Sequence, residues 1–493
     1  MDKHFGIMPI LFNKDILRTV TSLLAALVLC GCPGTDAEVD VTGFPPVFPD
    51  YTEVTVPSEM APPRFKVTVP CEKTRVVFRA AEEQLVVKGS EEVRIPRRGW
   101  RKLLQTGASE VEVHVSVRQD GRWVTYDPFH IYISVVPVDR YLTYRRISPG
   151  YSVYGAMGIY RRDLHTYKEK PLIENSFAEG SCVNCHSYAA GDPNSMMFHV
   201  RGKQGGTVII ADGKTEFVDL KTPGTLSAGV YPYWHPSGDY IAYSVNVTRQ
   251  LFHNRPDKVL DVYDLASDII IYDVKNEHLI IPASLQDSTL FETFPAFSAD
   301  GKTLYFCAAF PGENPDGDKA DPLDLRYSLY KTSFDPEDGS VGDSVTKVVE
   351  LEGKSIAFPR PSPDGKYIMF TVSSYGTFPI WHPEADLYML DPGSGKVDIL
   401  EELNSRDTDS YHSWSSNSRW IVFSSRRIDG LHTRLYIALL KEDGTFTKPF
   451  LLPQYSAGYY DELLQSFNIP EFSKGPVDFS PRDLEEPARP VSY

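Results

Sequence analysis

The sequence predicts an all-β protein in which an N-terminal β-sandwich is followed by a six- or seven-bladed β-propeller. Two observations carry this prediction. Between residues 51 and 137, short segments such as "EVEVHVSV" alternate apolar and polar residues, which is the period of a half-buried strand. Between residues 138 and 453, one strand–turn–strand motif recurs several times, and such repeats are typical of propeller blades.

The N-terminus has the pattern of an exported lipoprotein. Lys14 and Arg18 precede an apolar run over 20–29, which is too short for a stable membrane span. The following "LCGC" places a small residue directly before Cys32, so we predict a signal peptide over 1–31 and lipidation of Cys32. An ordinary cleaved signal is the alternative, and both interpretations export the protein. Residues 32–50 are rich in Pro, Gly and acids and are predicted to form a tether.

The charge of the chain limits its partners. The 493 residues carry a formal net charge of −16, which gives no electrostatic attraction toward phosphate backbones. We therefore expect no nucleic-acid partner. The expected partners are an envelope protein or redox partner docked on the propeller, and a membrane reached through the lipid anchor. The expected location is the cell envelope, with the protein facing the periplasm or the cell surface.

The repeated motif indicates where the blades lie. Four segments align, and each has an aromatic-rich start, a tight turn and an alternating strand. Gly238, Gly301, Gly365 and Ser418 occupy the same turn position, where a positive φ angle favours glycine. The aligned segments are 231–244, 294–307, 358–371 and 411–424.

One short motif suggests a cofactor. Cys182, Cys185 and His186 form C-x-x-C-H within "SCVNCHS", the pattern through which c-type haem is attached. In that interpretation the two cysteines form thioether bonds and His186 binds the haem iron. The surrounding segment over 171–205 is rich in Gly, Ser, Pro and Asn, so we predict that it is a loop inserted into the propeller.

A sixth iron ligand is expected a short distance downstream. Met196, Met197 and His199 are the candidates, because ten extended residues span about 33 Å and reach round a porphyrin to its opposite face. An open or remote-ligand site remains an alternative, and the methionine pair also fits ordinary core filling.

Three other interpretations of the cysteine motif stay open. A zinc site formed with His186 and His199 does not match the usual finger spacing. A thiol–disulfide pair lacks a preceding βαβ pattern. A small structural disulfide would leave the protein with no cofactor.

The propeller segments resemble a known repeat. The core "SPDGKYIxFxS" of the TolB-type propeller matches best over 362–370, well over 298–306, and less closely over 235–243 and 415–423. The wider pattern, from "GIYRRDL" through "CVNCHSY" to "YPYWHPSGDYIAYSVN", is similar to exported TolB-like β-propeller lipoproteins of Bacteroidetes that carry a single C-x-x-C-H segment. The resemblance implies a fold and a location but no activity.

The expected function follows from the cofactor. We expect electron transfer or redox sensing through one covalent haem c, with the propeller as the docking surface. The alternative is a non-enzymatic protein-binding scaffold in which the C-x-x-C-H segment is structural. The sequence contains no G-x-S-x-G motif and no P-loop, so an enzyme is not favoured. Residues 454–493 are predicted to be a C-terminal extension with helical pattern only near 459–467.

Overall fold

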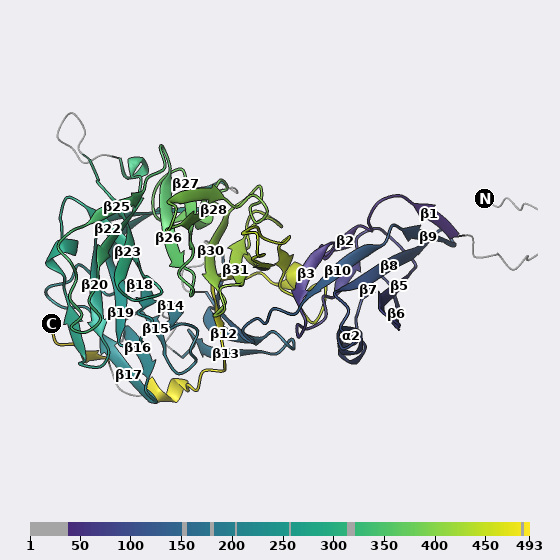
Figure 1. Ribbon diagram of the computed structural model, residues 1–493, viewed down its shortest axis with the longest axis horizontal. Helices are drawn as coiled ribbons and strands as arrows, with labels where there is room; N and C mark the ends of the chain where they lie inside the picture. Colours follow the sequence, from purple (N-terminus) through teal and green to yellow (C-terminus); the bar gives the residue numbers. More distant parts are fainter. Residues whose placement is uncertain are drawn as a thin grey trace, which may run out of the picture.

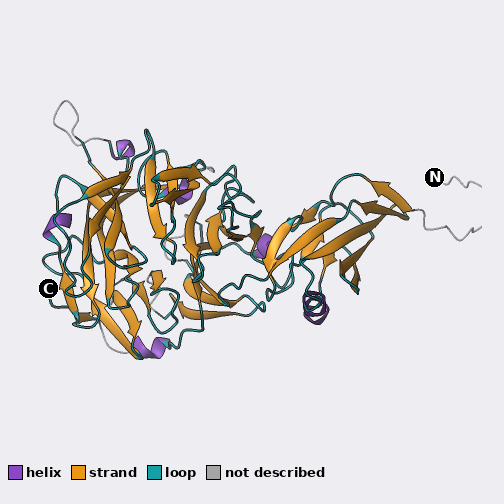
Figure 2. Cartoon of the chain, in the orientation of Figure 1, coloured by secondary structure: helices purple, strands orange, loops and turns teal. Residues whose placement is uncertain are grey.

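The computed structural model describes residues 38–149, 155–177, 182–202, 205–255, 258–312, 321–484 and 488–493. Strands are the main secondary structure of this part of the chain, and the few helices are short (Figure 2). The predicted signal peptide and Cys32 lie outside the described residues. None of the helices that the structure describes is long and apolar enough to cross a membrane.

The N-terminal part consists of two sheets that lie to one side of the remaining strands (Figure 1). The larger sheet has seven strands and the smaller has three. The larger sheet contains β1 (Glu38–Val41), β3 (Val54–Pro57), β5 (Lys73–Ala80), β6 (Glu83–Gly89), β8 (Glu110–Gln119), β9 (Arg122–Tyr126) and β10 (Phe129–Ser134). The smaller sheet contains β2 (Val47–Phe48), β4 (Phe65–Val67) and β7 (Glu92–Val93).

The two N-terminal sheets share one hydrophobic core. Phe65 of β4 lies 6.5 Å, centroid to centroid, from Phe78 of β5, and Phe78 contacts Trp100 at 6.4 Å. Trp100 belongs to α2 (Arg97–Leu104), a helix that the strand pattern did not predict. The alternation of buried and exposed residues along β5 explains why one face of this sheet is apolar.

The remaining strands form six sheets, each built on four antiparallel strands, which is the arrangement of a β-propeller (Figure 1). In five of the sheets these four strands are consecutive in the chain. We number these blades 1 to 6 and give each from its innermost strand outward. Blade 1 is β34 (Ser466–Ser473), β11 (Tyr141–Ile147), β12 (Gly158–Asp163) and β13 (Glu169–Glu174). Blade 2 is β14 (Val183–Tyr188), β15 (Met196–Val200), β16 (Gly206–Ala211) and β17 (Lys214–Asp219), with β35 (Arg489–Pro490) at its edge. Blade 3 is β18 (Val230–Trp234), β19 (Tyr240–Phe252), β20 (Leu260–Asp273) and β21 (His278–Ile280).

The other three blades follow the same plan. Blade 4 is β22 (Phe291–Phe297), β23 (Thr303–Ala309), β24 (Ser328–Ser333) and β25 (Thr346–Val349). Blade 5 is β26 (Ser355–Pro361), β27 (Ile368–Ser373), β28 (Asp386–Asp391) and β29 (Lys396–Ile399). Blade 6 is β30 (Asp409–Trp414), β31 (Trp420–Ser425), β32 (Arg434–Leu439) and β33 (Phe450–Leu451). Short helices lie in the connections: η1 (Ala283–Leu285), η2 (Pro322–Asp324), η3 (Pro379–Trp381), α3 (Tyr459–Glu462) and η4 (Pro481–Leu484).

The ring of blades is closed by a strand from the C-terminal part of the chain. β34 pairs antiparallel with β11, so the innermost strand of blade 1 comes from the segment that the sequence pattern assigned to an extension. Blade 1 therefore contains strands from both ends of the propeller, which closes the circle of blades. The predicted helix near 459–467 is present only as the single turn of α3.

The repeated turns have the backbone that their sequence predicts. Gly238, Gly301 and Gly365 have φ angles of 82°, 73° and 73°, and Ser418 has a φ angle of 61°. These turns connect the innermost strand of a blade to the next strand. The turn residues therefore set the register of the hairpins, as the alignment of the four segments implied.

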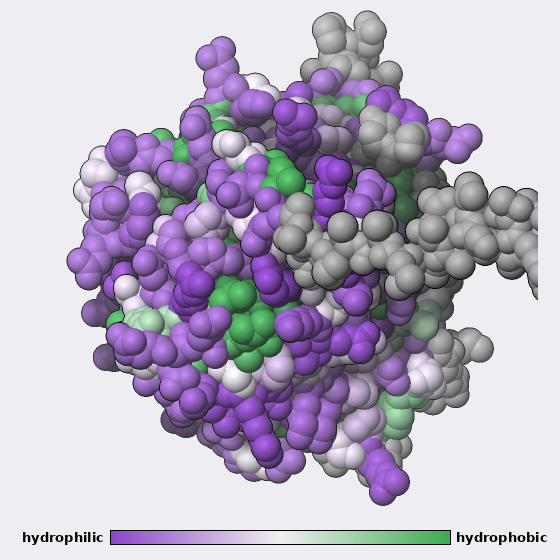
Figure 3. All heavy atoms as spheres, turned by 90° about the vertical axis from the view of Figure 1, so that its right-hand side faces the viewer, coloured by the Kyte–Doolittle hydropathy of each residue, from purple (hydrophilic) through white to green (hydrophobic). Residues whose placement is uncertain are grey.

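Direct contacts join the N-terminal sheets to blade 6. The Tyr51 hydroxyl donates to the Leu451 carbonyl at 3.1 Å, and Lys448 forms an ion pair with Asp50 at 2.7 Å. Figure 3 views the molecule from the side of the N-terminal sheets. That face is mostly hydrophilic, with hydrophobic side chains gathered in a small cluster.

Candidate functional site in the central channel

Each of the six innermost strands contains one residue in the left-handed backbone region. The register of each innermost strand with its neighbour shifts at or beside this residue, which is the signature of a β-bulge. Equivalent bulges in all six blades point six side chains toward the common axis. We call these residues the bulge ring: Cys185, Tyr231, Phe294, Phe358, Tyr411 and Ile469, with φ angles between 48° and 55°.

Aromatic side chains fill most of the bulge ring. The ring centroids of Tyr231 and Phe294 are 4.5 Å apart, those of Phe294 and Phe358 are 4.3 Å apart, and those of Phe358 and Tyr411 are 4.7 Å apart. Tilted aromatic pairs at such distances are favourable contacts. The four aromatic side chains form a plug across the channel, and Cys185 and Ile469 complete it.

A second ring lies two residues further along each innermost strand. We call them the polar ring: Ser187, Tyr233, Ala296, Arg360, Ser413 and Glu471. A cavity of about 160 Å³ is lined by five of them, with Ala296 as the exception, and also by the aromatic side chains of Tyr188, Trp234, Phe297 and Trp414.

The charged side of this cavity is formed by blades 5, 6 and 1. Burial raises the pKa of Glu471 to about 7, while the positive charge of Arg360 acts in the opposite direction. The Tyr188 backbone N–H donates to Glu471 Oε1 at 3.1 Å. Ser413 stands between Arg360 and Glu471 in the polar ring. Its hydroxyl is buried and has no hydrogen-bond partner in the described parts of the chain. The Arg360 guanidinium also lies over the Tyr233 ring, 5.0 Å from its centroid.

The structure places the C-x-x-C-H motif in a blade and not in an inserted loop. Cys182 precedes β14 and is half-buried, whereas Cys185 and His186 lie within β14 and are 4% and 2% exposed. Burial raises the pKa of the Cys185 thiol and lowers the pKa of His186 to about 3. Neither His186 nitrogen has a well-formed hydrogen bond within the described residues, although the Thr143 backbone lies near enough to act on the pKa.

The three predicted sixth ligands lie in the neighbouring strand, β15. Met196 and Met197 are fully buried, in two different hydrophobic clusters between blades. His199 is 3% exposed, and its Nδ1 atom lies 2.9 Å from the Thr207 hydroxyl. The methionines therefore fill the core, which is the alternative that their sequence pattern left open.

These residues do not fit a covalent haem. The cavity beside Cys185 and His186 has a volume of about 20 Å³, enough for about one water molecule. Pockets that bury a drug-sized ligand have volumes of about 300–1,000 Å³, and a haem is at least as large as such a ligand. Five of the six candidate residues lie in the paired strands β14 and β15, so a macrocycle between them would require the blade to open. The prediction of haem c at this motif is therefore wrong.

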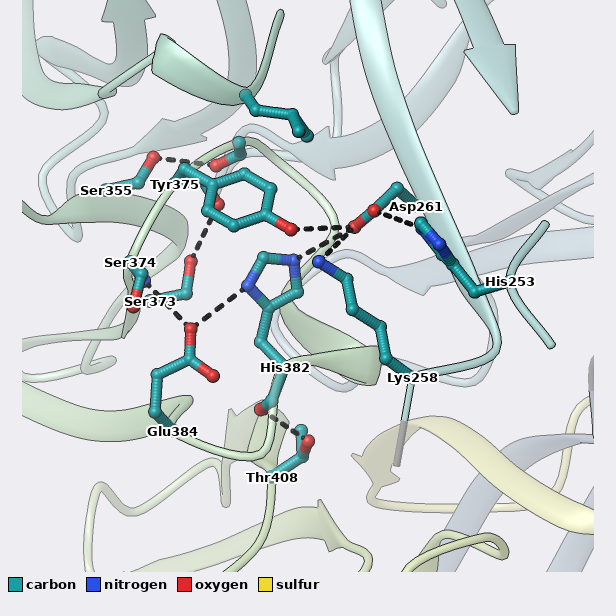
Figure 4. Close-up of polar contacts among 12 residues, drawn as sticks. His253, Lys258, Asp261, Ser355, Ser373, Ser374, Tyr375, His382, Glu384 and Thr408 are labelled. Atoms are coloured by element: carbon teal, nitrogen blue, oxygen red, sulfur yellow. Dashed lines mark hydrogen bonds and ion pairs between the residues drawn. The ribbon is translucent and has the colours of Figure 1, made fainter. Parts of the chain in front are cut away.

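Figure 4 shows a separate cluster of charged groups. Asp261, near the start of β20, accepts hydrogen bonds from His253 at 2.6 Å and from the Tyr375 hydroxyl at 3.2 Å, and it pairs with Lys258 at 3.1 Å. His382 lies between Asp261 and Glu384. These residues come from connections between second and third strands, whereas the 160 Å³ cavity lies beside the turns after the first strands.

The charged groups of this cluster bind one another, and we interpret the cluster as a clamp between two blades. Its hydrogen bonds lower the pKa of Asp261 to about 2, and its two carboxylates raise the pKa of His382. The β19–β20 hairpin of blade 3 is thereby attached to the loop of blade 5 that carries Tyr375. We call His253, Lys258, Asp261, Tyr375, His382 and Glu384 the interblade clamp.

The sequence pattern missed both the polar ring and the clamp. One signal was present: Tyr233 and Arg360 stand two residues after the aromatic start of their aligned segments, and Ser413 occupies the same position in the fourth. Glu471 carries no such signal, because β34 lies outside the aligned repeats.

No protein-family model and no curated protein matches the chain. Solved structures with partial similarity include a puromycin hydrolase, with 14% identity and a TM-score of 0.37 over 63% of this chain and 52% of the other. An oligogalacturonate lyase in complex with manganese has 16% identity and a TM-score of 0.35 over 62% and 78%. Prolyl oligopeptidase B from Galerina marginata has 13% identity and a TM-score of 0.34 over 62% and 44%. The match thus spans about half the length of the puromycin hydrolase.

These findings correct several expectations from the sequence. The similar structures carry the names of a hydrolase, a lyase and a peptidase, and not of TolB-like haem lipoproteins. The haem-based electron transfer is wrong, because the space beside Cys185 and His186 excludes a haem. The expected resemblance to TolB-like haem lipoproteins is corrected with it, and the interpretation in which an enzyme is not favoured is not retained. None of these similarities assigns a substrate or a reaction to this chain.

Proposed function

We propose that the protein is an enzyme that moves a proton to or from a small anionic organic substrate bound in the 160 Å³ cavity. The observation that carries the proposal is the carboxyl group of Glu471 inside this cavity, with a pKa of about 7. A general acid–base group works best when its pKa lies near the working pH. A carboxyl group with an ordinary pKa would be almost wholly ionised there.

Arg360 is the group that would bind the negative charge of the substrate. Arg360 lines the same cavity as Glu471, and its guanidinium lies over the aromatic ring of Tyr233. A guanidinium recognises carboxylate or phosphate through paired hydrogen bonds. Neutralising the substrate's charge would also favour removal of a proton from an adjacent position, because negative charge develops there.

Ser413 stands between these two groups in the polar ring. Its buried hydroxyl lacks a partner among the described residues, and a bound substrate would supply one. The aromatic side chains on the other side of the cavity would contact an apolar or ring-shaped part of the substrate. The substrate class is therefore a small organic acid with an apolar or cyclic body.

The proposal can be tested by incubating the purified protein with a mixture of small metabolites and following their depletion by mass spectrometry. We expect the unmodified protein to deplete at least one organic acid, and Glu471→Gln to bind this compound but to turn it over at least 100-fold more slowly. Arg360→Met should raise the KM of the same compound. Glu442→Gln, in an exposed turn, is the matched control and should have unchanged activity.

Equal depletion by the unmodified protein and by Glu471→Gln would overturn the role of Glu471. If no organic acid is depleted and none shifts the melting temperature, the cavity is not a substrate site. Binding without turnover would retain the ligand but remove the enzymatic part of the proposal.

We further propose, on the sequence alone, that the protein acts in the cell envelope. Lys14, Arg18 and the apolar run before Cys32 support export, and lipidation of Cys32 would attach the protein to a membrane. An envelope protein docked on the propeller is the proposed partner. Metabolic labelling with a fatty acid should mark the unmodified protein and not Cys32→Ser, and labelling of both would contradict the anchor.

A further inference from the structure

The hairpin of β19 and β20 in blade 3 is much longer than the equivalent hairpins of the other blades. β19 has 13 residues and β20 has 14, whereas the second and third strands of the other blades have five to seven. The innermost strand β18 pairs with β19 only as far as Ser244. Residues 246–252 of β19 therefore continue beyond the four-stranded sheet with β20 as their partner.

The β20 side of this extension is attached to the rest of the propeller. Asp261 belongs to the interblade clamp, and the Tyr327 hydroxyl donates to Asp264 Oδ2 at 2.9 Å. Val259, directly before β20, is 1% exposed and belongs to the same hydrophobic cluster as Phe294 of the bulge ring. Because one strand is fixed to the molecule, the other is held in an extended conformation before any partner binds, which lowers the entropy cost of binding.

The outer edge of β19 is free along the extension. Residues 247–252 are all exposed, and no third strand in the described chain pairs with them. The His253 backbone N–H donates to the Val259 carbonyl at 2.9 Å, so these two residues form a hydrogen-bonded pair of the antiparallel ladder. Such pairs alternate with non-hydrogen-bonded ones, so the N–H groups of Thr248 and Gln250 point away from β20. Unpaired groups along an exposed edge are a template for a further strand.

The side chains of this edge are mainly apolar and include a single positive charge. Val247, Leu251 and Phe252 are 39%, 43% and 57% exposed. Arg249 is the only charged residue in 246–252, and it forms no ion pair among the described residues. Its neighbour across the hairpin is the uncharged Tyr263. A strand that adds to this edge therefore meets apolar side chains and one cation without a counter-ion.

We propose that the β19 edge over 246–252 binds an extended segment of another protein by strand addition, and that this segment carries a carboxylate between apolar residues. In this binding mode, main-chain hydrogen bonds provide affinity and alternate side chains provide specificity. A carboxylate opposite Arg249 would form a cross-strand ion pair, which is a favourable contact in a sheet.

A second copy of this chain fits the edge less well. If two β19 edges paired antiparallel about Arg249, the two guanidinium groups would lie opposite each other, and like charges in that position are destabilising. The net charge of −16 also opposes association between two copies. The surface depends on neither the proposed reaction nor the proposed anchor, because none of residues 246–252 lines the 160 Å³ cavity.

The test is selection from a random library of displayed peptides of about ten residues, long enough to cover the free edge, with the full chain as bait. We expect the enriched peptides to alternate apolar residues and to contain Asp or Glu. Their Kd should rise about tenfold or more for Gln250→Pro, which removes an outward N–H but no hydrogen bond of the hairpin, and for Arg249→Glu. Arg122→Glu makes the same charge change at an exposed position of β9 and should bind as the unmodified protein does.

Hydrogen exchange distinguishes strand addition from binding elsewhere. An enriched peptide should slow exchange of the Thr248 and Gln250 amides about tenfold or more, because these N–H groups become hydrogen-bonded. Unchanged exchange at both amides in the presence of bound peptide would contradict strand addition.

Three further outcomes would overturn the proposal. The first is that no peptide is enriched, or that the enriched peptides lack acidic residues. The second is that both Gln250→Pro and Arg249→Glu bind the enriched peptides as tightly as the unmodified protein. The third is a dimer in sedimentation experiments that Gln250→Pro dissociates, because a second copy then occupies the edge. If Gln250→Pro does not fold, Arg249→Glu alone decides, and undiminished binding by it contradicts the assigned contact.

Discussion

His382 Nε2 lies 3.6 Å from Asp261 Oδ1, and this contact joins the loop of blade 5 to the long hairpin of blade 3 across the intervening blade. On its other side, His382 Nδ1 lies 3.3 Å from Glu384 Oε1. The side chains of His382 and Asp261 are each 4% exposed, so solvent weakens their attraction little. The stability of the propeller should therefore depend on the charge of one histidine.

We predict that the stabilisation from His382 decreases with increasing pH. The two carboxylates raise the pKa of His382 above 6.5, so its contribution is fully present below pH 6.5 and is lost as the pH rises through the higher pKa of the folded state. Urea unfolding of the unmodified protein and of His382→Gln should differ most near pH 6 and converge toward pH 9. A difference that grows with pH would contradict the charged state assigned to His382.

Asp261→Asn should be more damaging than the histidine change. It removes the negative charge that pairs with Lys258 and His382 and weakens the acceptor of the His253 hydrogen bond, so the buried His382 cation keeps only Glu384 as a partner. We expect a loss of about 2–4 kcal/mol in the free energy of unfolding at pH 7. Because the pKa of Asp261 is about 2, the loss should persist down to about pH 4. Asp338→Asn, at an exposed turn, should change the stability by less than about 0.5 kcal/mol and serves as the control.

The two cysteines of the C-x-x-C-H motif should differ in reactivity. Cys182 is half-buried, whereas Cys185 is 4% exposed in the bulge ring and its pKa is raised by burial. The thiolate is the reactive form, so we expect a maleimide to modify Cys182 of the folded protein well before Cys185. Fragmentation of the tryptic peptide that contains both cysteines in a tandem mass spectrometer measures the order, with buried Cys307 as an internal reference. Equal rates for Cys182 and Cys185 would show that the bulge ring opens in solution.

The sequence predicted the propeller blades best where local chemistry decides the structure. The turn position shared by Gly238, Gly301, Gly365 and Ser418 requires a positive φ angle, and residue type reports that requirement directly. The starts of the four aligned segments, Tyr231, Phe294, Phe358 and Tyr411, proved to be members of the bulge ring. The repeat thus contained the channel plug without showing that its members meet.

The sequence could not predict the site, because the site depends on contacts between distant segments. Glu471 and Arg360 are 111 positions apart and line one cavity only after β34 closes blade 1. The C-x-x-C-H motif misled for a related reason: Cys185 and His186 occupy a blade strand, and their burial there excludes the space that a haem requires. Spacing alone does not report the volume around a motif.

Phe358 is predicted to be the residue that holds the channel plug together. It contacts the rings of both Phe294 and Tyr411, and it lines both the large and the small cavity. Phe358→Ala should lower the free energy of unfolding by about 3–5 kcal/mol, because a buried ring is replaced by a void. Phe310→Ala, at a position 63% exposed, should cost less than about 0.5 kcal/mol. Chemical denaturation measures the free energy of unfolding of both variants. Equal losses would show that the channel plug does not contribute to the stability of the fold.

Glu471 should be a residue whose replacement stabilises the protein while removing its activity. Its pKa of about 7 in the folded state lies above its ordinary value of 4.5, so the unfolded chain ionises first as the pH rises. The free energy of unfolding therefore decreases between about pH 4.5 and pH 7, and above pH 7 the buried charge remains a constant cost. Glu471→Gln removes this cost, and we expect it to be more stable than the unmodified protein by about 1–3 kcal/mol at pH 8 and nearly equal to it at pH 4. Urea unfolding at the two pH values measures the difference. If the variant is less stable at both pH values, favourable contacts hold the carboxylate in place. That result would contradict a destabilising Glu471 as the acid–base group on which the proposed reaction depends.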